Sequence, residues 1–98
     1  MFVKKTIQIQ NPQGLHARPA SLFVQIANKY ESDITVKKDD EVVNGKSIMG
    51  LLVLGANQGS IIEVEISGED ALEMMKELES FLSRVSEDDP SAHEKDAK

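Results

Sequence analysis

Two side chains suited to phosphate chemistry, His16 and Arg18, stand directly before Pro19 in the segment Gly-Leu-His-Ala-Arg-Pro-Ala. An imidazole can form a covalent bond to a phosphoryl group, and a guanidinium can hydrogen-bond two of its oxygens at once. Proline is harmless in a helix only in the first turn, where its missing N–H is not needed. The segment therefore predicts a helix that begins near His16.

The backbone at such a helix start is itself suited to anions. If His16 is the N-cap, the N–H groups of Ala17 and Arg18 lack an intrahelical acceptor and can point at an anion on the imidazole. The helix dipole disfavours an imidazolium, so it favours a neutral, nucleophilic ring, and it stabilises the negative charge of a phosphorylated one. We therefore predict that His16 carries a phosphoryl group, with Arg18 and the two N–H groups as its ligands.

Features that would turn phosphate binding into catalysis are missing from the sequence. It has no GxxxxGK[ST] loop and no acidic cluster near His16 that would hold Mg²⁺. The other histidine, His93, lies in the polar C-terminal segment. We expect no metal, no cofactor and no autonomous turnover, and so a stoichiometric carrier rather than an enzyme.

Seven segments with strand or helix patterns are expected to position these residues. Strands are predicted at 2–10, 33–37, 42–43 and 60–67, and helices at 18–29, 48–52 and 71–85. Ser47 is expected to cap the second helix, and Ser67 with Asp70 resembles a capping box for the third. The order βαββαβα favours an α+β open-faced sandwich with the three helices on one face of the sheet.

Length and charge limit the class of protein. The 98 residues suffice for one domain, predicted at 1–85, and the acidic residues 86–98 are expected to form a disordered tail. A net charge of −6 argues against nucleic acid as a partner. Without cysteine or a long apolar run, the chain is expected to be cytoplasmic and not to insert into membranes. It is also expected to be a monomer.

Two segments carry a resemblance to a known family. Gly-Leu-His-Ala-Arg-Pro-Ala matches the phosphorylation segment of HPr, the histidine-containing phosphocarriers of the phosphoenolpyruvate-dependent sugar phosphotransferase system. Lys-Ser-Ile-Met-Gly, residues 46–50, resembles the region around the regulatory serine of that family. The resemblance covers about residues 3–85 and implies a four-stranded antiparallel sheet covered by three helices.

The resemblance also implies partners and roles. His16 would be phosphorylated on Nδ1 by enzyme I and would donate to enzyme IIA domains, with Arg18 as the phosphate partner. Ser47 would be the site of an HPr kinase/phosphorylase whose product is read by a transcription regulator. The apolar contact surface for partners would consist of Ile48, Met49 and Leu52.

Two alternatives stay open at this point. A phosphocarrier of the nitrogen-related branch of the phosphotransferase system shares the histidine chemistry but serves regulation. A purely regulatory binding module would use Ser47 and the apolar surface without transferring phosphate from His16.

Overall fold

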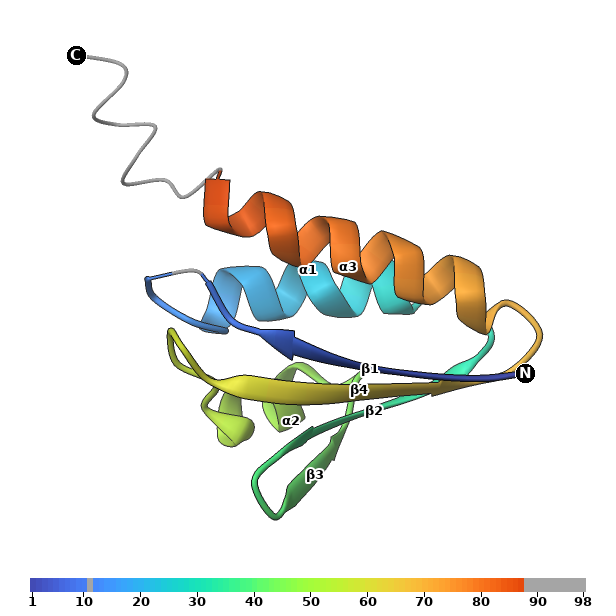
Figure 1. The fold of residues 1–98 in the computed structure, drawn as a ribbon, viewed down its shortest axis with the longest axis horizontal. Helices are drawn as coiled ribbons and strands as arrows, with labels where there is room; N and C mark the ends of the chain where they lie inside the picture. Colours follow the sequence, from blue (N-terminus) through green and yellow to red (C-terminus); the bar gives the residue numbers. More distant parts are fainter. Residues whose placement is uncertain (11, 88–98) are drawn as a thin grey trace.

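The predicted order of elements and the α+β fold class are confirmed by a computed structural model, which describes residues 1–10 and 12–87 (Figure 1). The strands are β1 (Phe2–Gln8), β2 (Asp33–Lys38), β3 (Glu41–Asn44) and β4 (Ile61–Ser67). The helices are α1 (Ala17–Ala27), α2 (Ile48–Leu54) and α3 (Ala71–Glu87). Two residues of the predicted tail belong to α3, and the rest of that tail, 88–98, lies outside the described residues.

The four strands form one antiparallel sheet in the order β1-β4-β2-β3. Strand alternation turns every second side chain toward the helices, so Val36 packs in the core between its partners Val43 and Val64. The opposite face is exposed and carries charged side chains, and there Lys4 pairs with Glu63 at 3.4 Å. The sheet is therefore covered on one face and open on the other, as predicted.

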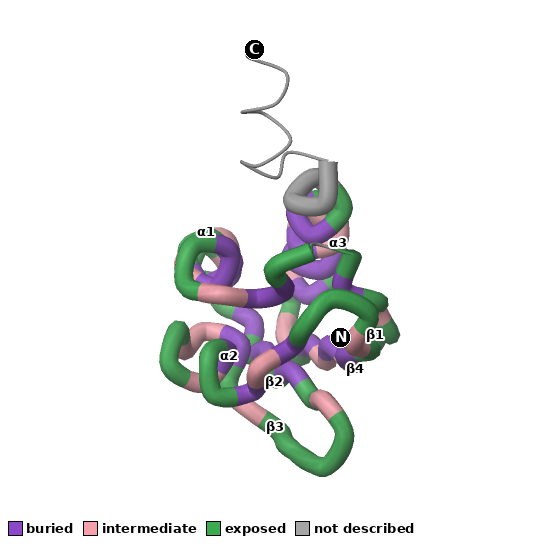
Figure 2. Tube along the Cα trace, turned by 90° about the vertical axis from the view of Figure 1, so that its left-hand side faces the viewer, coloured by how far each residue is buried: buried purple, intermediate pink, exposed green. Residues whose placement is uncertain are grey.

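The helix layer closes over the apolar face, with α1 and α3 side by side (Figures 1 and 2). In both helices a set of apolar side chains recurs at helical spacing and is buried. Within the described residues, no helix is long and apolar enough to cross a bilayer. The residues buried in α1 are Pro19, Ala20, Phe23, Val24 and Ala27.

The capping box predicted from Ser67 and Asp70 is wrong. Ser67 is the last residue of β4 and is paired on both sides within the sheet, so it cannot begin a helix. Helix α3 begins at Ala71, which places Asp70 directly before it. Sheet pairing, which is non-local, therefore overrides the local pattern that suggested the cap.

The carboxylate of Asp70 instead joins the start of α3 to the segment between α1 and β2. It accepts hydrogen bonds from the Ser32 hydroxyl and from the N–H groups of Glu31 (2.9 Å) and Ser32 (3.0 Å). The Ser32 hydroxyl and the Glu31 N–H lower the pKa of Asp70. The ionised carboxylate therefore stabilises the fold above its unfolded-state pKa, about 4, and this contribution is lost as the pH falls through the lower folded-state pKa.

The Asp70→Asn variant is expected to be less stable than the wild type at pH 7, and to lose less of its stability on acidification. An amide supplies only one oxygen and no charge to the three donors that the carboxylate serves. Urea midpoints of both proteins at pH 7 and pH 3 measure the difference. If both proteins lost the same stability between pH 7 and pH 3, this role of Asp70 would be contradicted, because the two proteins share every other carboxylate.

Candidate functional site

His16 stands where the loop after β1 becomes helix α1, as predicted. It is the N-cap residue, with extended backbone angles of φ −90° and ψ −169°. Its carbonyl accepts the first helical hydrogen bond, from Ala20 N at 2.9 Å. The half-buried imidazole makes no cap hydrogen bond to the helix, so the helix itself does not occupy the ring nitrogens.

Ala17 and Arg18 are the first two residues of α1, and both are exposed. Their N–H groups precede the first intrahelical donor, Ala20, and so point out of the helix end that carries the imidazole. Within the part of the chain that the structure describes, no ion pair engages the Arg18 guanidinium. The helix start therefore combines a ring nucleophile, two backbone donors and a cation outside any of these ion pairs.

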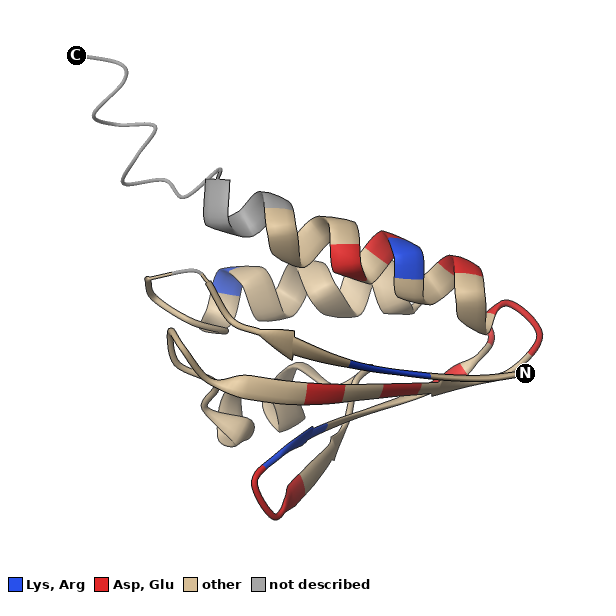
Figure 3. Cartoon of the chain, viewed as in Figure 1, with Lys and Arg blue, Asp and Glu red and all other residues tan. Residues whose placement is uncertain are grey.

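Carboxylates are absent from the segments that build this end of the molecule. Residues 9–30, which contain the His16 loop and α1, include no Asp or Glu, and neither do residues 42–62 around α2. Figure 3 shows acidic residues instead in the β2–β3 turn, in β4 and along α3. Neither segment therefore places a carboxylate against a doubly negative phosphoryl group on His16.

The loop that follows α2, residues 55–60, is bonded to the loop that carries His16. Leu15 N donates to the Ala56 carbonyl at 2.8 Å. Farther back, Ile9 N donates to the Ser60 carbonyl and Gly59 N to the Ile9 carbonyl, each at 2.8 Å. Sequence patterns did not predict this contact, because no periodicity relates residues so far apart in the chain.

Ser47 is the N-cap of α2, as predicted. Its hydroxyl oxygen accepts a hydrogen bond from Gly50 N at 2.9 Å. The helix continues to Leu54, two residues beyond the predicted end, and stops at Gly55, whose left-handed backbone (φ 63°) terminates helices without steric cost. Ser47 and the His16 loop therefore lie at opposite ends of the same short helix.

One side of α2 exposes four apolar side chains, which we call the α2 surface. The exposed fractions are 69% for Met49 and 65% for Val53, with about 40% for Ile48 and Leu52. Val53 is absent from the predicted surface, because a seven-residue apolar run has too few turns to separate buried from exposed positions. Since α2 packs against α1, the α2 surface belongs to the same end of the fold as His16.

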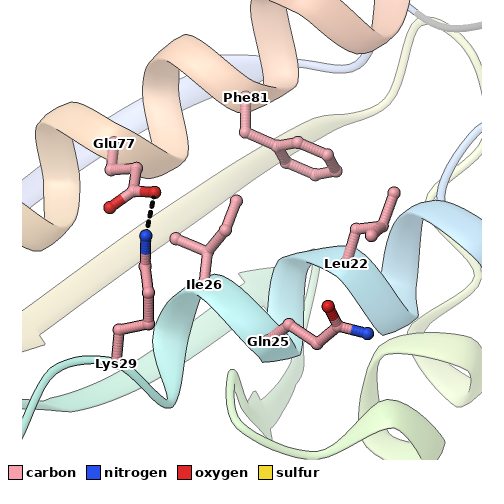
Figure 4. A pocket seen from close by; sticks show the side chains of 6 residues that line it. All are labelled: Leu22, Gln25, Ile26, Lys29, Glu77 and Phe81. Atoms are coloured by element: carbon pink, nitrogen blue, oxygen red, sulfur yellow. Dashed lines mark hydrogen bonds and ion pairs between the residues drawn. The ribbon is translucent and has the colours of Figure 1, made fainter.

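A separate groove of about 400 Å³ lies between α1 and α3, lined by Leu22, Gln25, Ile26, Lys29, Glu77 and Phe81 (Figure 4). Its charges compensate each other, because Lys29 Nζ lies 2.5 Å from Glu77 Oε2. Tyr30 Oη donates to Glu77 Oε1 at 2.5 Å, and this bond, with desolvation, raises the pKa of Tyr30 to about 12. His16 does not line this groove, which therefore stands apart from the candidate site.

Known proteins are similar to this chain over most of its length. The family model described as "PTS HPr component phosphorylation site" matches residues 3–84. Phosphocarrier protein HPr of Neisseria meningitidis serogroup A is 44% identical over 82 residues, which cover 84% of this chain and 92% of that protein. The HPr-like protein Crh of Halalkalibacterium halodurans is 44% identical over 83 residues, 85% of this chain and 99% of that protein.

Solved structures agree with the fold. The crystal structure of HPr from Bacillus anthracis str. Ames superposes with a TM-score of 0.78 at 44% identity, covering 82% of this chain and 95% of that chain. HPr from Thermoanaerobacter tengcongensis and Crh from Bacillus subtilis have been solved as dimers, so the monomeric state expected here stays a prediction. The match over most of the chain, on an open-faced sandwich with a histidine at the start of α1, shows that the chain belongs to the HPr family of phosphocarrier proteins of the phosphotransferase system.

Proposed function

We propose that this chain is a cytoplasmic phosphocarrier that accepts a phosphoryl group on Nδ1 of His16 from phosphorylated enzyme I. It then passes the group to enzyme IIA domains during sugar uptake. The observation that supports this most strongly is the uncapped imidazole at the start of α1, beside the N–H groups of Ala17 and Arg18. A helix start of this kind stabilises the anionic product.

The transfer needs little covalent machinery from this chain. The lone pair of the His16 ring nitrogen attacks phosphorus as the bond between phosphorus and the donor group of enzyme I breaks, so positioning and charge neutralisation dominate. The guanidinium of Arg18 and the backbone donors supply positive charge. Since nothing in this scheme regenerates the donor, the protein acts as a stoichiometric carrier and takes its phosphate from one protein to another.

Ser47 is proposed as a second, regulatory phosphorylation site for an HPr kinase/phosphorylase. Phosphorylation adds a charge of about −1.5 to −2, which the start of a helix tolerates. The same charge would stand beside the apolar α2 surface, where Ile48 and Met49 directly follow Ser47. Docking of partners on that surface would therefore change with the state of Ser47.

Labelling from phosphoenolpyruvate tests the proposed function. The protein is incubated with phosphoenolpyruvate and catalytic enzyme I, and the adduct is measured by intact mass before and after exposure to acid and to base. One phosphoryl group that is lost in acid and kept in base is expected for a phosphohistidine. An unlabelled protein, or an acid-stable adduct, would reject the proposal.

A regulatory function is the second candidate, favoured by the relative named HPr-like protein Crh at 44% identity and by the cap position of Ser47. Capture of a transcription regulator only by Ser47-phosphorylated protein, together with an inert His16, would favour a binding module. Transfer from His16 to a nitrogen-branch enzyme IIA domain, and not to sugar-specific ones, would instead place the carrier in that branch.

The Arg18→Ala variant is expected to accept phosphate about 10- to 100-fold more slowly, because one charged donor to the transferred group is lost. Its stability should stay within about 0.5 kcal/mol of the wild type, since the side chain is exposed and a cation at a helix start is unfavourable. Rapid-quench single-turnover rates measure the effect. The Arg18→Lys variant keeps the charge but not the planar guanidinium, so its rate should lie between those of the wild type and Arg18→Ala. A wild-type rate in Arg18→Ala would contradict the role of Arg18 in transfer.

A further inference from the structure

We propose that Gly14 and Ala56, the residues at which the His16 loop meets the loop after α2, act together to position His16 for transfer, an inference that rests on the proposed phosphocarrier function. Gly14 has a left-handed backbone with φ +70°. A Cβ atom at this residue would lie 2.3 Å from the Ala56 carbonyl oxygen and 2.8 Å from Asn57 Cα. Backbone atoms cannot yield as a flexible side chain can, so only glycine lets the two loops meet.

This close approach allows a hydrogen bond that holds the residue directly before His16. Leu15 N donates to the Ala56 carbonyl at 2.8 Å, and both residues are buried, with exposed fractions of 5% and 2%. On the other side, the His16 carbonyl is held by Ala20 N at 2.9 Å. The backbone of His16 is therefore fixed from both directions, which leaves the side-chain torsions to set the direction of the ring.

The same contact joins His16 to the α2 surface. Ala56 follows the last residue of α2 by only two positions, with Gly55 between them as the left-handed C-cap. A partner docked on the α2 surface therefore contacts a helix whose C-terminal end is hydrogen-bonded, through Ala56, to the His16 loop. In-line attack on phosphorus depends strongly on distance and angle, so this rigid connection sets where the imidazole meets the donor.

Gly14→Ala and Gly59→Ala form a matched pair of variants. Both place alanine at a positive φ, +70° and +88°, and both lie in the two bonded loops. Only the first forces the loops apart, because a Cβ at Gly59 has nothing within 4 Å. Single-turnover transfer from phosphorylated enzyme I is measured at a temperature where circular dichroism shows both variants folded.

The expected result separates positioning from docking. Gly14→Ala should lower the maximal transfer rate about 10- to 100-fold, with the half-saturating donor concentration unchanged. Gly59→Ala should keep both values of the wild type. Equal maximal rates in the two variants, corrected for the folded fraction, would overturn the inference.

A backbone substitution keeps the test valid should Gly14→Ala fail to fold. An amide-to-ester replacement at Leu15 removes the N–H donor to Ala56 and weakens the preceding carbonyl as an acceptor, and a matched ester elsewhere shares both changes. The matched ester at Gly68 removes a bond of similar length, 2.9 Å to the Met1 carbonyl. This bond lies at the N-terminus, and Figure 1 shows the N-terminus at the opposite end of the sheet from the start of α1. The Leu15 ester alone should slow the maximal rate and shift the ring ¹H and ¹⁵N resonances of His16.

The two hypotheses fail in distinguishable ways. If wild-type protein accepts no phosphoryl group, the proposed function is rejected, and the ring resonances of the two esters still decide whether the Ala56 contact orients His16. If wild-type protein is labelled normally but the Leu15 ester matches the Gly68 ester in rate and in ring resonances, the positioning role alone is rejected.

Discussion

Replacement of His16 by asparagine is expected to abolish phosphoryl uptake and, at the same time, to stabilise the fold. The native histidine is the N-cap of α1 but makes no cap hydrogen bond, whereas asparagine is among the most favourable N-cap residues. The side-chain oxygen of asparagine can accept a hydrogen bond from Arg18 N, but not from the next residue, Pro19, which has no N–H. With one donor available, we expect a gain of about 0.5–1 kcal/mol in the free energy of unfolding.

Urea unfolding and labelling from phosphoenolpyruvate, done on the same preparations, measure both effects. The His16→Ala variant is the matched control, because it supplies neither a nucleophile nor a cap. It should also remain unlabelled, but with a stability within about 0.5 kcal/mol of the wild type. Label on either variant would contradict the role of His16, and an asparagine variant less stable than the alanine variant would contradict the cap argument.

The start of α1 also explains why a candidate site could be predicted from the sequence. Local rules are broken at the start of α1, which has a weak cap residue, no acidic residue in its first turn and a cation at its positive end. Pro19 limits where the helix can begin, and this limit alone places His16 and Arg18 at that end. Departures from local preference of this kind point to function.

Contacts between distant segments could not be found in the same way. The approach of Gly14 to Ala56, and the hydrogen bonds from Glu31 and Ser32 to Asp70, depend on how the sheet and the helices pack. Glycine is typical of turns in general, but the close contact of Gly14 with another backbone leaves no periodic signal. Alternation predicted β2 and β4 well, because buried side chains alternate with more exposed ones along both strands.

Replacement of Met49 by aspartate is expected to weaken docking of phosphorylated enzyme I by about 30-fold or more. Met49 is 69% exposed, the largest fraction on the α2 surface, and the few hot-spot side chains of an interface each contribute about 2 kcal/mol or more. A carboxylate would also lose its hydration inside the complex. The fold itself should keep its stability, because an acidic side chain in the first turn of a helix is favourable.

Transfer rates measured across a range of donor concentrations test this role. Met49→Asp should raise the half-saturating concentration and leave the maximal rate unchanged, the reverse of the pattern expected for Gly14→Ala. Val42→Asp is the matched control, because Val42 is 59% exposed but lies on β3, outside the α2 surface. Equal changes in the two variants would mean that the α2 surface has no special part in docking. A fall in maximal rate for Met49→Asp would mean instead that this side chain acts on the chemistry at His16.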